Sequence, residues 1–263
     1  MKKHIPNSLT LLNLFSGCCG IIACLQNQHQ LVPLFIGISL LADFLDGFAA
    51  RALKVKSDLG GQLDSLADMV TFGVLPGIML FSIINAKVSL ITGITMYPNL
   101  SELGRTKISY TDFKDFTLGL IGFVYTLFAC LRLAKFNIDT RQTVDFIGLN
   151  TPSGAIFILG FYMQYFTDWQ FRTNWDYSIY AKITAMILPF VLAFLMVAEF
   201  RMFSLKGNPF SWKQNKFRVI LLISAIPQLI LLQWIGLSTV ILSYIIFAFL
   251  YNILEGSKLS SAS

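Results

Sequence analysis

Two apolar segments of the chain meet at an acidic stretch that decides the fold. It reads Ala42-Asp43-Phe44-Leu45-Asp46-Gly47-Phe48-Ala49-Ala50-Arg51 and, after eight intervening residues, Gly60-Gly61-Gln62-Leu63-Asp64-Ser65-Leu66-Ala67-Asp68. Asp43 and Asp46 are three positions apart at the end of one apolar segment. Asp64 and Asp68 are four positions apart at the start of the next. Both spacings place a carboxylate pair on one face of a helix.

The connection between the two pairs is short, and it predicts a helical hairpin. We expect a turn containing Ser57, Gly60 and Gly61 to join two antiparallel helices, so that the acidic pairs face each other. Four carboxylates in an apolar bundle repel one another strongly unless a cation neutralises them. Mg²⁺, Mn²⁺ and Ca²⁺ prefer oxygen ligands, and a two-metal site stabilises in-line displacement at phosphorus.

Small and basic residues accompany the acidic pairs. Gly47, Ala50 and Gly60 leave room for a ligand to approach the helix backbones. Arg51 can bind a phosphate oxygen through its planar guanidinium group. A single aspartate at a helix end is usually a cap or an interfacial residue, but four on one helical hairpin predict a functional site.

The composition predicts an all-α, polytopic integral membrane helical bundle. Of the 263 residues, 55% are hydrophobic and 13% are charged, whereas soluble domains carry about 25% charged residues. Apolar runs of about 20 residues recur from end to end, and we treat residues 1–263 as a single membrane domain. About eight transmembrane helices are expected, at residues 8–27, 31–53, 63–86, 116–136, 150–166, 178–200, 217–234 and 237–254.

The basic residues predict the orientation of this bundle. With eight spans, 14 of the 20 Lys and Arg residues fall on the side of both termini, which favours a cytoplasmic location for both ends. The site would then face the cytoplasm from a multi-pass protein of the cell inner membrane. The net charge of +6 is explained by this orientation signal and by anionic lipids, and we expect no nucleic acid partner.

Sulfur and imidazole side chains predict neither a disulfide framework nor a zinc site. The cysteines lie inside apolar runs and the histidines at segment ends, at Cys18, Cys19, Cys24, Cys130, His4 and His29. Any metal ion must therefore be held by oxygen ligands.

The acidic stretch resembles the signature of the CDP-alcohol phosphotransferases. The match is complete over Asp43-x2-Asp46-Gly47-x2-Ala50-Arg51-x8-Gly60-x3-Asp64-x3-Asp68. The resemblance implies two divalent cations, Mg²⁺ or Mn²⁺ with Ca²⁺ as a further candidate, held by the four aspartates. It also implies a CDP-linked lipid bound through its diphosphate and cytidine, Asp68 as the general base, and a homodimer.

Further segments resemble bacterial phosphatidylserine synthases, a subfamily of this family. The segment Cys130–Asn137 is similar to their C-x-R-L-A-R-F-N segment, with Lys135 in place of an arginine. Weaker similarities lie at Gly148–Ala155, where Asn150 stands in place of a common proline, and at Leu195–Arg201. The resemblance covers residues 1–200 as the family core, whereas 201–263 is expected to form an additional C-terminal transmembrane hairpin.

This narrower resemblance implies transfer of the phosphatidyl group of CDP-diacylglycerol to L-serine, with release of CMP, in a membrane whose lipids surround the protein. The resemblance, which includes Pro6–Asn13, assigns CDP-diacylglycerol binding to Asn7, Thr10, Asn13, Asp43, Gly47, Ala50, Arg51, Gly60 and Asp64. Serine binding is assigned to Arg132, Lys135 and Asn137.

Several alternatives stay open on the sequence alone. The acceptor alcohol could be glycerol 3-phosphate or inositol, because the aspartate signature carries no information about which acceptor binds. Arg132 and Lys135 could simply be positive residues that end a span on the cytoplasmic side, and Asn7, Thr10 and Asn13 could belong to a capped helix start. A cation-coupled transporter also uses intramembrane carboxylates, but the chain shows no internal repeat.

Overall fold

The chain folds into a bundle of long helices. The computed structural model describes residues 4–55, 57–88, 95–96, 116–138, 146–168, 175–202 and 212–260. The helical elements are α1 (His4–Leu25), η1 (His29–Leu31), α2 (Val32–Ala52), α3 (Asp58–Asp68), η2 (Met69–Val74), α4 (Leu75–Asn85), η3 (Leu120–Gly122), α6 (Phe123–Ile138), α7 (Thr151–Thr167), α9 (Trp175–Val197) and α10 (Trp212–Ser260). Two short antiparallel pairs join β1 (Lys87–Val88) to β2 (Thr95–Met96) and β3 (Phe146–Ile147) to β4 (Arg201–Met202).

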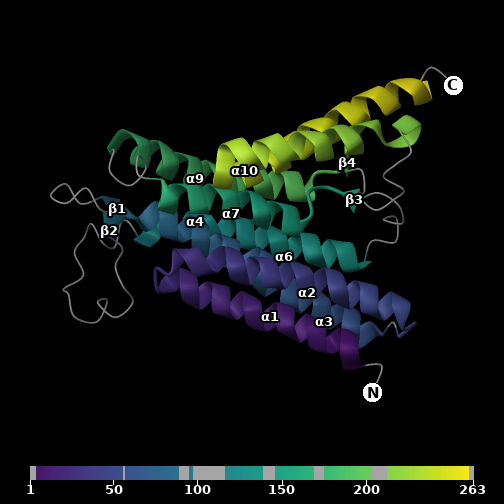
Figure 1. Cartoon of the computed structure of the whole chain (residues 1–263), viewed down its shortest axis with the longest axis horizontal. Helices are drawn as coiled ribbons and strands as arrows, with labels where there is room; N and C mark the ends of the chain where they lie inside the picture. Colours follow the sequence, from purple (N-terminus) through teal and green to yellow (C-terminus); the bar gives the residue numbers. More distant parts are fainter. Residues whose placement is uncertain are drawn as a thin grey trace.

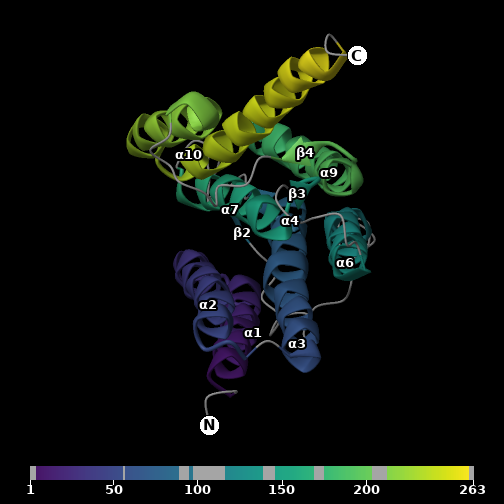
Figure 2. The same ribbon diagram turned by 90° about the vertical axis from the view of Figure 1, so that its right-hand side faces the viewer.

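Helix α4 forms the centre of the bundle. It contacts α1, α6, α7 and α9. In the helical stretch Asp58–Asn85, which contains α4, 67% of the most apolar part is buried, whereas the corresponding share is 22–39% for the other long helices. Figure 2 shows α1, α2 and α3 on one side of it and α7, α9 and α10 on the other. Figure 1 shows that both chain ends and the α2–α3 connection lie at one end of the bundle, whereas β1 and β2 lie at the opposite end.

The predicted all-α membrane bundle is confirmed, but the count of eight spans is not. Within the described residues, six helical stretches are long and apolar enough to cross a membrane: His4–Leu25, His29–Ala52, Asp58–Asn85, Phe116–Ile138, Asp176–Val197 and Arg218–Ile253. Helix α7 has 17 residues and is shorter than a usual span. The last two predicted spans both lie within α10.

The chain nevertheless reverses direction within α10, at Gln233. Its φ of 51° lies in the left-handed region. Ser243 Oγ donates a hydrogen bond to Gln228 Oε1 at 3.4 Å, although these residues would lie about 22 Å apart along a straight helix. Gly236 packs so closely on the backbone of Gln228 and Leu229 that a Cβ atom there would collide. Helix α10 is therefore a hairpin of two arms (Figure 1).

A wide helical turn, η2, separates α3 from α4, and the sequence explains it. Pro76 has no N–H group for the carbonyl oxygen of Phe72, four residues earlier, and its ring would clash with that carbonyl in a regular α-helix. In the structure the freed oxygen accepts a hydrogen bond from Tyr125 Oη of α6 at 3.0 Å. Thr126 Oγ1 likewise donates to the carbonyl oxygen of Gly73 at 2.9 Å. Helix α6 thus holds the turn that follows Asp68.

Candidate active site

The acidic hairpin is formed by α2 and α3, whose connection is shorter than the sequence suggested. Ser57 is the N-cap of α3, and its Oγ atom accepts a hydrogen bond from the backbone N–H of Gly60 at 3.1 Å. The helix therefore begins at Asp58. The prediction that Gly60 and Gly61 form the turn was wrong, because the Ser57 cap starts the helix before them.

Three of the four signature aspartates converge between these helices. Asp43 of α2 and both Asp64 and Asp68 of α3 each offer a carboxylate oxygen, and the three oxygens lie within 4.8 Å of one another. We call these residues the carboxylate trio. Asp46, one turn after Asp43, is buried and faces α1, where its Oδ2 accepts a hydrogen bond from Thr10 Oγ1 at 2.6 Å.

The carboxylate trio fits a hard divalent cation. Its donors are all oxygen atoms, the ligands that Mg²⁺ and Mn²⁺ prefer. Asp64 Oδ1 is buried and has no hydrogen-bond partner among the residues that the structure describes. Buried carboxylate oxygens are costly to leave unpaired, so this atom indicates a ligand that the described residues do not supply. Asp46 is also within electrostatic reach of Asp64.

Helix α1 contributes polar side chains to the same region. Asn13 Nδ2 donates a hydrogen bond to Asp68 Oδ1 at 3.1 Å. Asn7, near the start of α1, lies beside Gly60, where a Cβ atom would come within 3.3 Å of Asn7 Oδ1. The structure thus brings the predicted residues of α1 to the acidic hairpin.

The predicted phosphate-binding residues lie on α2. The guanidinium of Arg51 folds back over Gly47, with Nη1 3.4 Å from the place that a Cβ atom would take. Arg51 is exposed and within electrostatic reach of Asp46. Ala50 is half-buried beside it. A Cβ atom at Gly47 would thus be in ordinary van der Waals contact with this guanidinium.

The C-terminal end of α6 carries the predicted acceptor residues. Arg132 is buried, with 8% of its surface exposed, and is within electrostatic reach of Asp68. Its Nη1 donates to Thr151 Oγ1 at 3.4 Å, and its Cζ lies 5.4 Å from the centre of the Phe136 ring. A buried guanidinium beside a carboxylate site is suited to binding an anionic group.

Lys135 and Asn137 occupy different surroundings from Arg132. Lys135 Nζ forms an exposed ion pair with Glu199 Oε1 at 3.4 Å. Asn137 exchanges hydrogen bonds with Ser65 Oγ of α3 at 2.9 and 3.1 Å, so it reaches the acidic hairpin. Of the three predicted acceptor residues, Arg132 interacts with Asp68 of α3 and Asn137 with Ser65 of α3, whereas the described ion pair of Lys135 is with Glu199.

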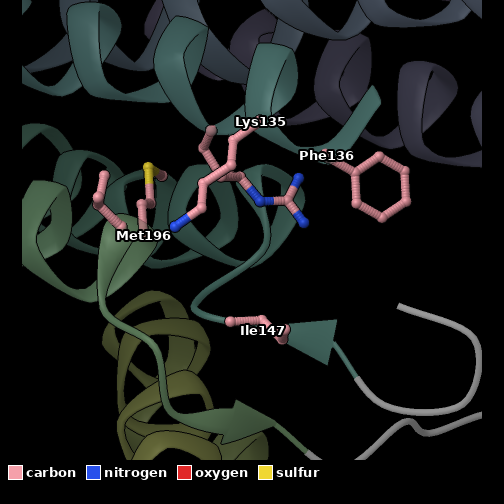
Figure 3. Close-up of a pocket in the computed structure, with 6 residues that line it drawn as sticks. Lys135, Phe136, Ile147 and Met196 are labelled. Atoms are coloured by element: carbon pink, nitrogen blue, oxygen red, sulfur yellow. The ribbon is translucent and has the colours of Figure 1, made fainter. Parts of the chain in front are cut away.

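A small hollow, partly open to solvent, lies beside these residues. Figure 3 shows Lys135 and Phe136 of α6 across from Met196 of α9 and Ile147 of β3. Arg132 and Val197 complete its lining. The guanidinium of Arg132 therefore borders an opening that reaches solvent.

The structure adds residues that the sequence analysis did not assign to the site, namely Ser65, Tyr125, Thr151 and Glu199. Ser65 stands between the two aspartates of α3, and Thr151 and Glu199 lie in the two weaker similarities. The position of these three residues within segments that resemble the family could have indicated a role in the site. Tyr125 gave none, because a tyrosine in an apolar span is usually read as packing.

Comparisons with known proteins identify the family of the chain. The sequence profile of the family described as CDP-alcohol phosphatidyltransferase matches residues 3–251. Three similar proteins are each named CDP-diacylglycerol–serine O-phosphatidyltransferase. The protein of Bacillus subtilis (strain 168) is 33% identical over 154 residues, which cover 57% of this chain and 70% of the relative.

The two other relatives are matched over a smaller share of their length. The protein of Methanocaldococcus jannaschii is 31% identical over 157 residues, covering 60% of this chain and 59% of the relative. That of Mycobacterium leprae (strain TN) is 28% identical over 194 residues, covering 70% of this chain and 55% of the relative. The matched part of the chain thus spans little more than half the length of these two proteins.

Proposed function

Because the chain belongs to the CDP-alcohol phosphatidyltransferase family, we propose that it transfers the phosphatidyl group of CDP-diacylglycerol to L-serine, giving phosphatidylserine and CMP. The observation that carries the proposal is the carboxylate trio, which lies within electrostatic reach of the buried Arg132 through Asp68. The three relatives named for this reaction support serine as the acceptor.

Asp43, Asp46, Asp64 and Asp68 would hold two divalent cations, Mg²⁺ or Mn²⁺, with Ca²⁺ as a further candidate. Bound cations would neutralise the charge on the diphosphate and on departing CMP. The carboxylate trio supports this role through its oxygen donors and through the unpaired, buried Asp64 Oδ1.

Asp68 would act as the general base of the transfer. As the serine hydroxyl oxygen forms its bond to the β-phosphorus, the bond from that phosphorus to the bridging oxygen breaks and CMP leaves. Asp68 takes the proton from the serine hydroxyl. The hydrogen bond that Asn13 Nδ2 donates to its Oδ1 supports this role, because it orients the carboxylate, and Arg132 lies within electrostatic reach of it.

The substrates would bind on opposite sides of the acidic hairpin. CDP-diacylglycerol would contact α1 and the α2–α3 face, at Asn7, Asp43, Gly47, Ala50, Arg51, Gly60 and Asp64. Thr10 and Asn13, which the resemblance also assigns to this ligand, are buried and would act on it through the aspartates to which they donate hydrogen bonds. Serine would enter from the hollow beside α6, with its carboxylate on Arg132 and with Lys135 and Asn137 at the entrance. The buried position of Arg132 and the exposed position of Lys135 support this order.

The protein would work as a homodimer in the inner membrane, with its site facing the cytoplasm. Both termini lie at the same end of the bundle as the acidic hairpin (Figure 1). The excess of basic residues on that side favours the cytoplasm. Molar-mass measurement of the purified protein in detergent would test the dimer.

The decisive experiment measures CMP release by the purified full chain with CDP-diacylglycerol and Mn²⁺ or Mg²⁺. Serine, glycerol 3-phosphate and inositol are offered separately, and Asp68→Asn serves as the inactive control. Serine-dependent release that EDTA abolishes supports the proposal. Release with another acceptor alone would overturn the choice of serine, and no release from a folded, metal-loaded sample would overturn the transferase function.

A further inference from the structure

We propose that helix α1 positions the catalytic carboxylates, with Asn13 fixing Asp68 and Thr10 fixing Asp46. The inference rests on the proposed function and gives these two α1 residues a role distinct from direct lipid binding. Both side chains are buried, with 3% of Thr10 and none of Asn13 exposed. They lie one helical turn apart, so they face the acidic hairpin from the same side of α1.

The two hydrogen bonds reach different helices. Thr10 Oγ1 donates to Asp46 Oδ2 of α2 at 2.6 Å. The other acceptor near this hydroxyl group is the carbonyl oxygen of Pro6, which is uncharged and lies further away, at 3.1 Å. Asn13 Nδ2 donates to Asp68 Oδ1 of α3 at 3.1 Å. The opposite orientation of the Asn13 amide would place two acceptor oxygens against each other, so the donor belongs on Asp68.

The register of α1 against both helices is fixed at the same position. The backbone carbonyl oxygen of Asn13 lies 3.2 Å from Ser39 Oγ of α2 and 3.2 Å from Thr71 Oγ1 of η2, and both hydroxyl groups donate to it. One turn further along, Gly17 packs against Thr71, where any Cβ atom would collide. These contacts oppose a shift of α1 along its axis, so they also preserve the hydrogen bond between Asn13 and Asp68.

The consequence is a defined orientation for each carboxylate. The terminal torsion of an aspartate is broad when nothing holds it. A charge-assisted hydrogen bond to one oxygen selects one orientation and leaves the second oxygen available for a ligand or a proton. Partners of this kind typically change metal affinity or activity by about ten- to a hundredfold when they are removed.

The Thr10 half of the proposal is tested without turnover. Mn²⁺ affinity is measured by electron paramagnetic resonance on the purified full chain, for wild type, Thr10→Val and Thr10→Ser. The valine variant is expected to bind Mn²⁺ about ten- to a hundredfold more weakly, whereas the serine variant, which keeps the hydroxyl, stays near the wild-type value. Equal affinity in the valine variant would overturn the role of Thr10.

The Asn13 half is tested by separating kcat from KM. Asn13→Leu is expected to lower kcat with serine by about ten- to a hundredfold and to leave KM for CDP-diacylglycerol unchanged. Ser8→Ala, on the exposed face of α1, is the control and should match the wild type. A raised KM for CDP-diacylglycerol with an intact kcat would overturn the proposal, because it indicates a direct lipid contact.

These measurements also separate this inference from the proposed function. A wild-type protein that releases no CMP with serine refutes the proposed function, while the Mn²⁺ titration of the Thr10 variants still tests positioning. A wild-type protein that is active with serine, combined with a normal kcat in Asn13→Leu, refutes the inference alone. Thermal unfolding in detergent verifies that each variant is folded.

Discussion

Replacing Asp64 by asparagine removes one charge from the carboxylate trio at nearly constant volume. The three oxygens lie within 4.8 Å of one another. At that distance, with an effective dielectric constant of about 20, two unit charges repel by about 3.5 kcal/mol. The substitution removes two of the three repulsive pairs, so with all three carboxylates ionised the relief is about 7 kcal/mol in the metal-free protein. We therefore expect Asp64→Asn to raise the stability of the metal-free protein and to weaken metal binding.

Thermal unfolding in detergent, with EDTA or with Mn²⁺, measures both effects. A ligand at one hundred times its Kd stabilises the folded state by about 2.7 kcal/mol. For a protein of this size each kcal/mol corresponds to roughly 2–4 °C, so Mn²⁺ is expected to raise the wild-type Tm by about 5–10 °C. At the same Mn²⁺ concentration Asp64→Asn should lose most of this rise, although its Tm in EDTA exceeds that of the wild type.

Asp58→Asn is the matched control for Asp64→Asn. Asp58 is exposed in the first turn of the same helix and lies outside the carboxylate trio, so its substitution should preserve the response to Mn²⁺. An unchanged Mn²⁺ response in Asp64→Asn would refute the metal-ligand role of Asp64. A lower Tm than the wild type in EDTA would refute the repulsion argument, because it requires a stabilising partner for this carboxylate.

Three further substitutions test other parts of the structure. Arg132→Gln should raise KM for serine about tenfold or more, because a charge-assisted bond is lost from a buried site; an unchanged KM in steady-state CMP release would refute the assignment. Lys135→Gln should shift the Tm by less than about 3 °C, since its ion pair with Glu199 is exposed, and a larger shift would show an unrecognised structural role. Tyr125→Phe should cost about 1–3 kcal/mol of stability, because Phe72 O loses its donor; an unchanged Tm in the same unfolding assay would contradict this.

The acidic hairpin could be predicted because its geometry is local. The spacing of Asp64 and Asp68 fixes their common face once the segment is helical, and an apolar chain in a membrane has few alternatives to helix. The turn was less predictable, since the residue types of Gly60 and Gly61 favour a turn, whereas the Ser57 cap decides where the helix starts.

Contacts between distant segments could not be predicted from one sequence. The hydrogen bonds of Thr10 and Asn13 depend on how α1 is placed beside the hairpin, and that placement is set by Ser39 and Thr71. The reversal in α10 lies close to the predicted break at residues 235–236, but the positive φ falls on Gln233, a residue type that does not signal it. The separation of 201–263 from a core of 1–200 stays a prediction.

The wide turn η2 had a visible cause in Pro76 but no visible partner. A proline predicts that the carbonyl oxygen four residues earlier loses its helical bond. It does not predict which group replaces that bond. Tyr125 supplies it from a helix about fifty residues further along the chain, and only the packed bundle reveals this.

The local origin of the acidic hairpin also has a consequence for the order of events during synthesis. Asp43 to Asp68 are made within one short interval, directly after α1, whereas Arg132 follows 64 residues later. At a synthesis rate of about 5–20 residues per second, the guanidinium of Arg132 is made roughly 3–13 s after the carboxylate of Asp68. Until then the counter-charges come from basic residues made earlier, such as Arg51 and Lys54, and from any divalent cation. A cation that binds the nascent hairpin would therefore hold α2 and α3 together while the rest of the bundle is inserted.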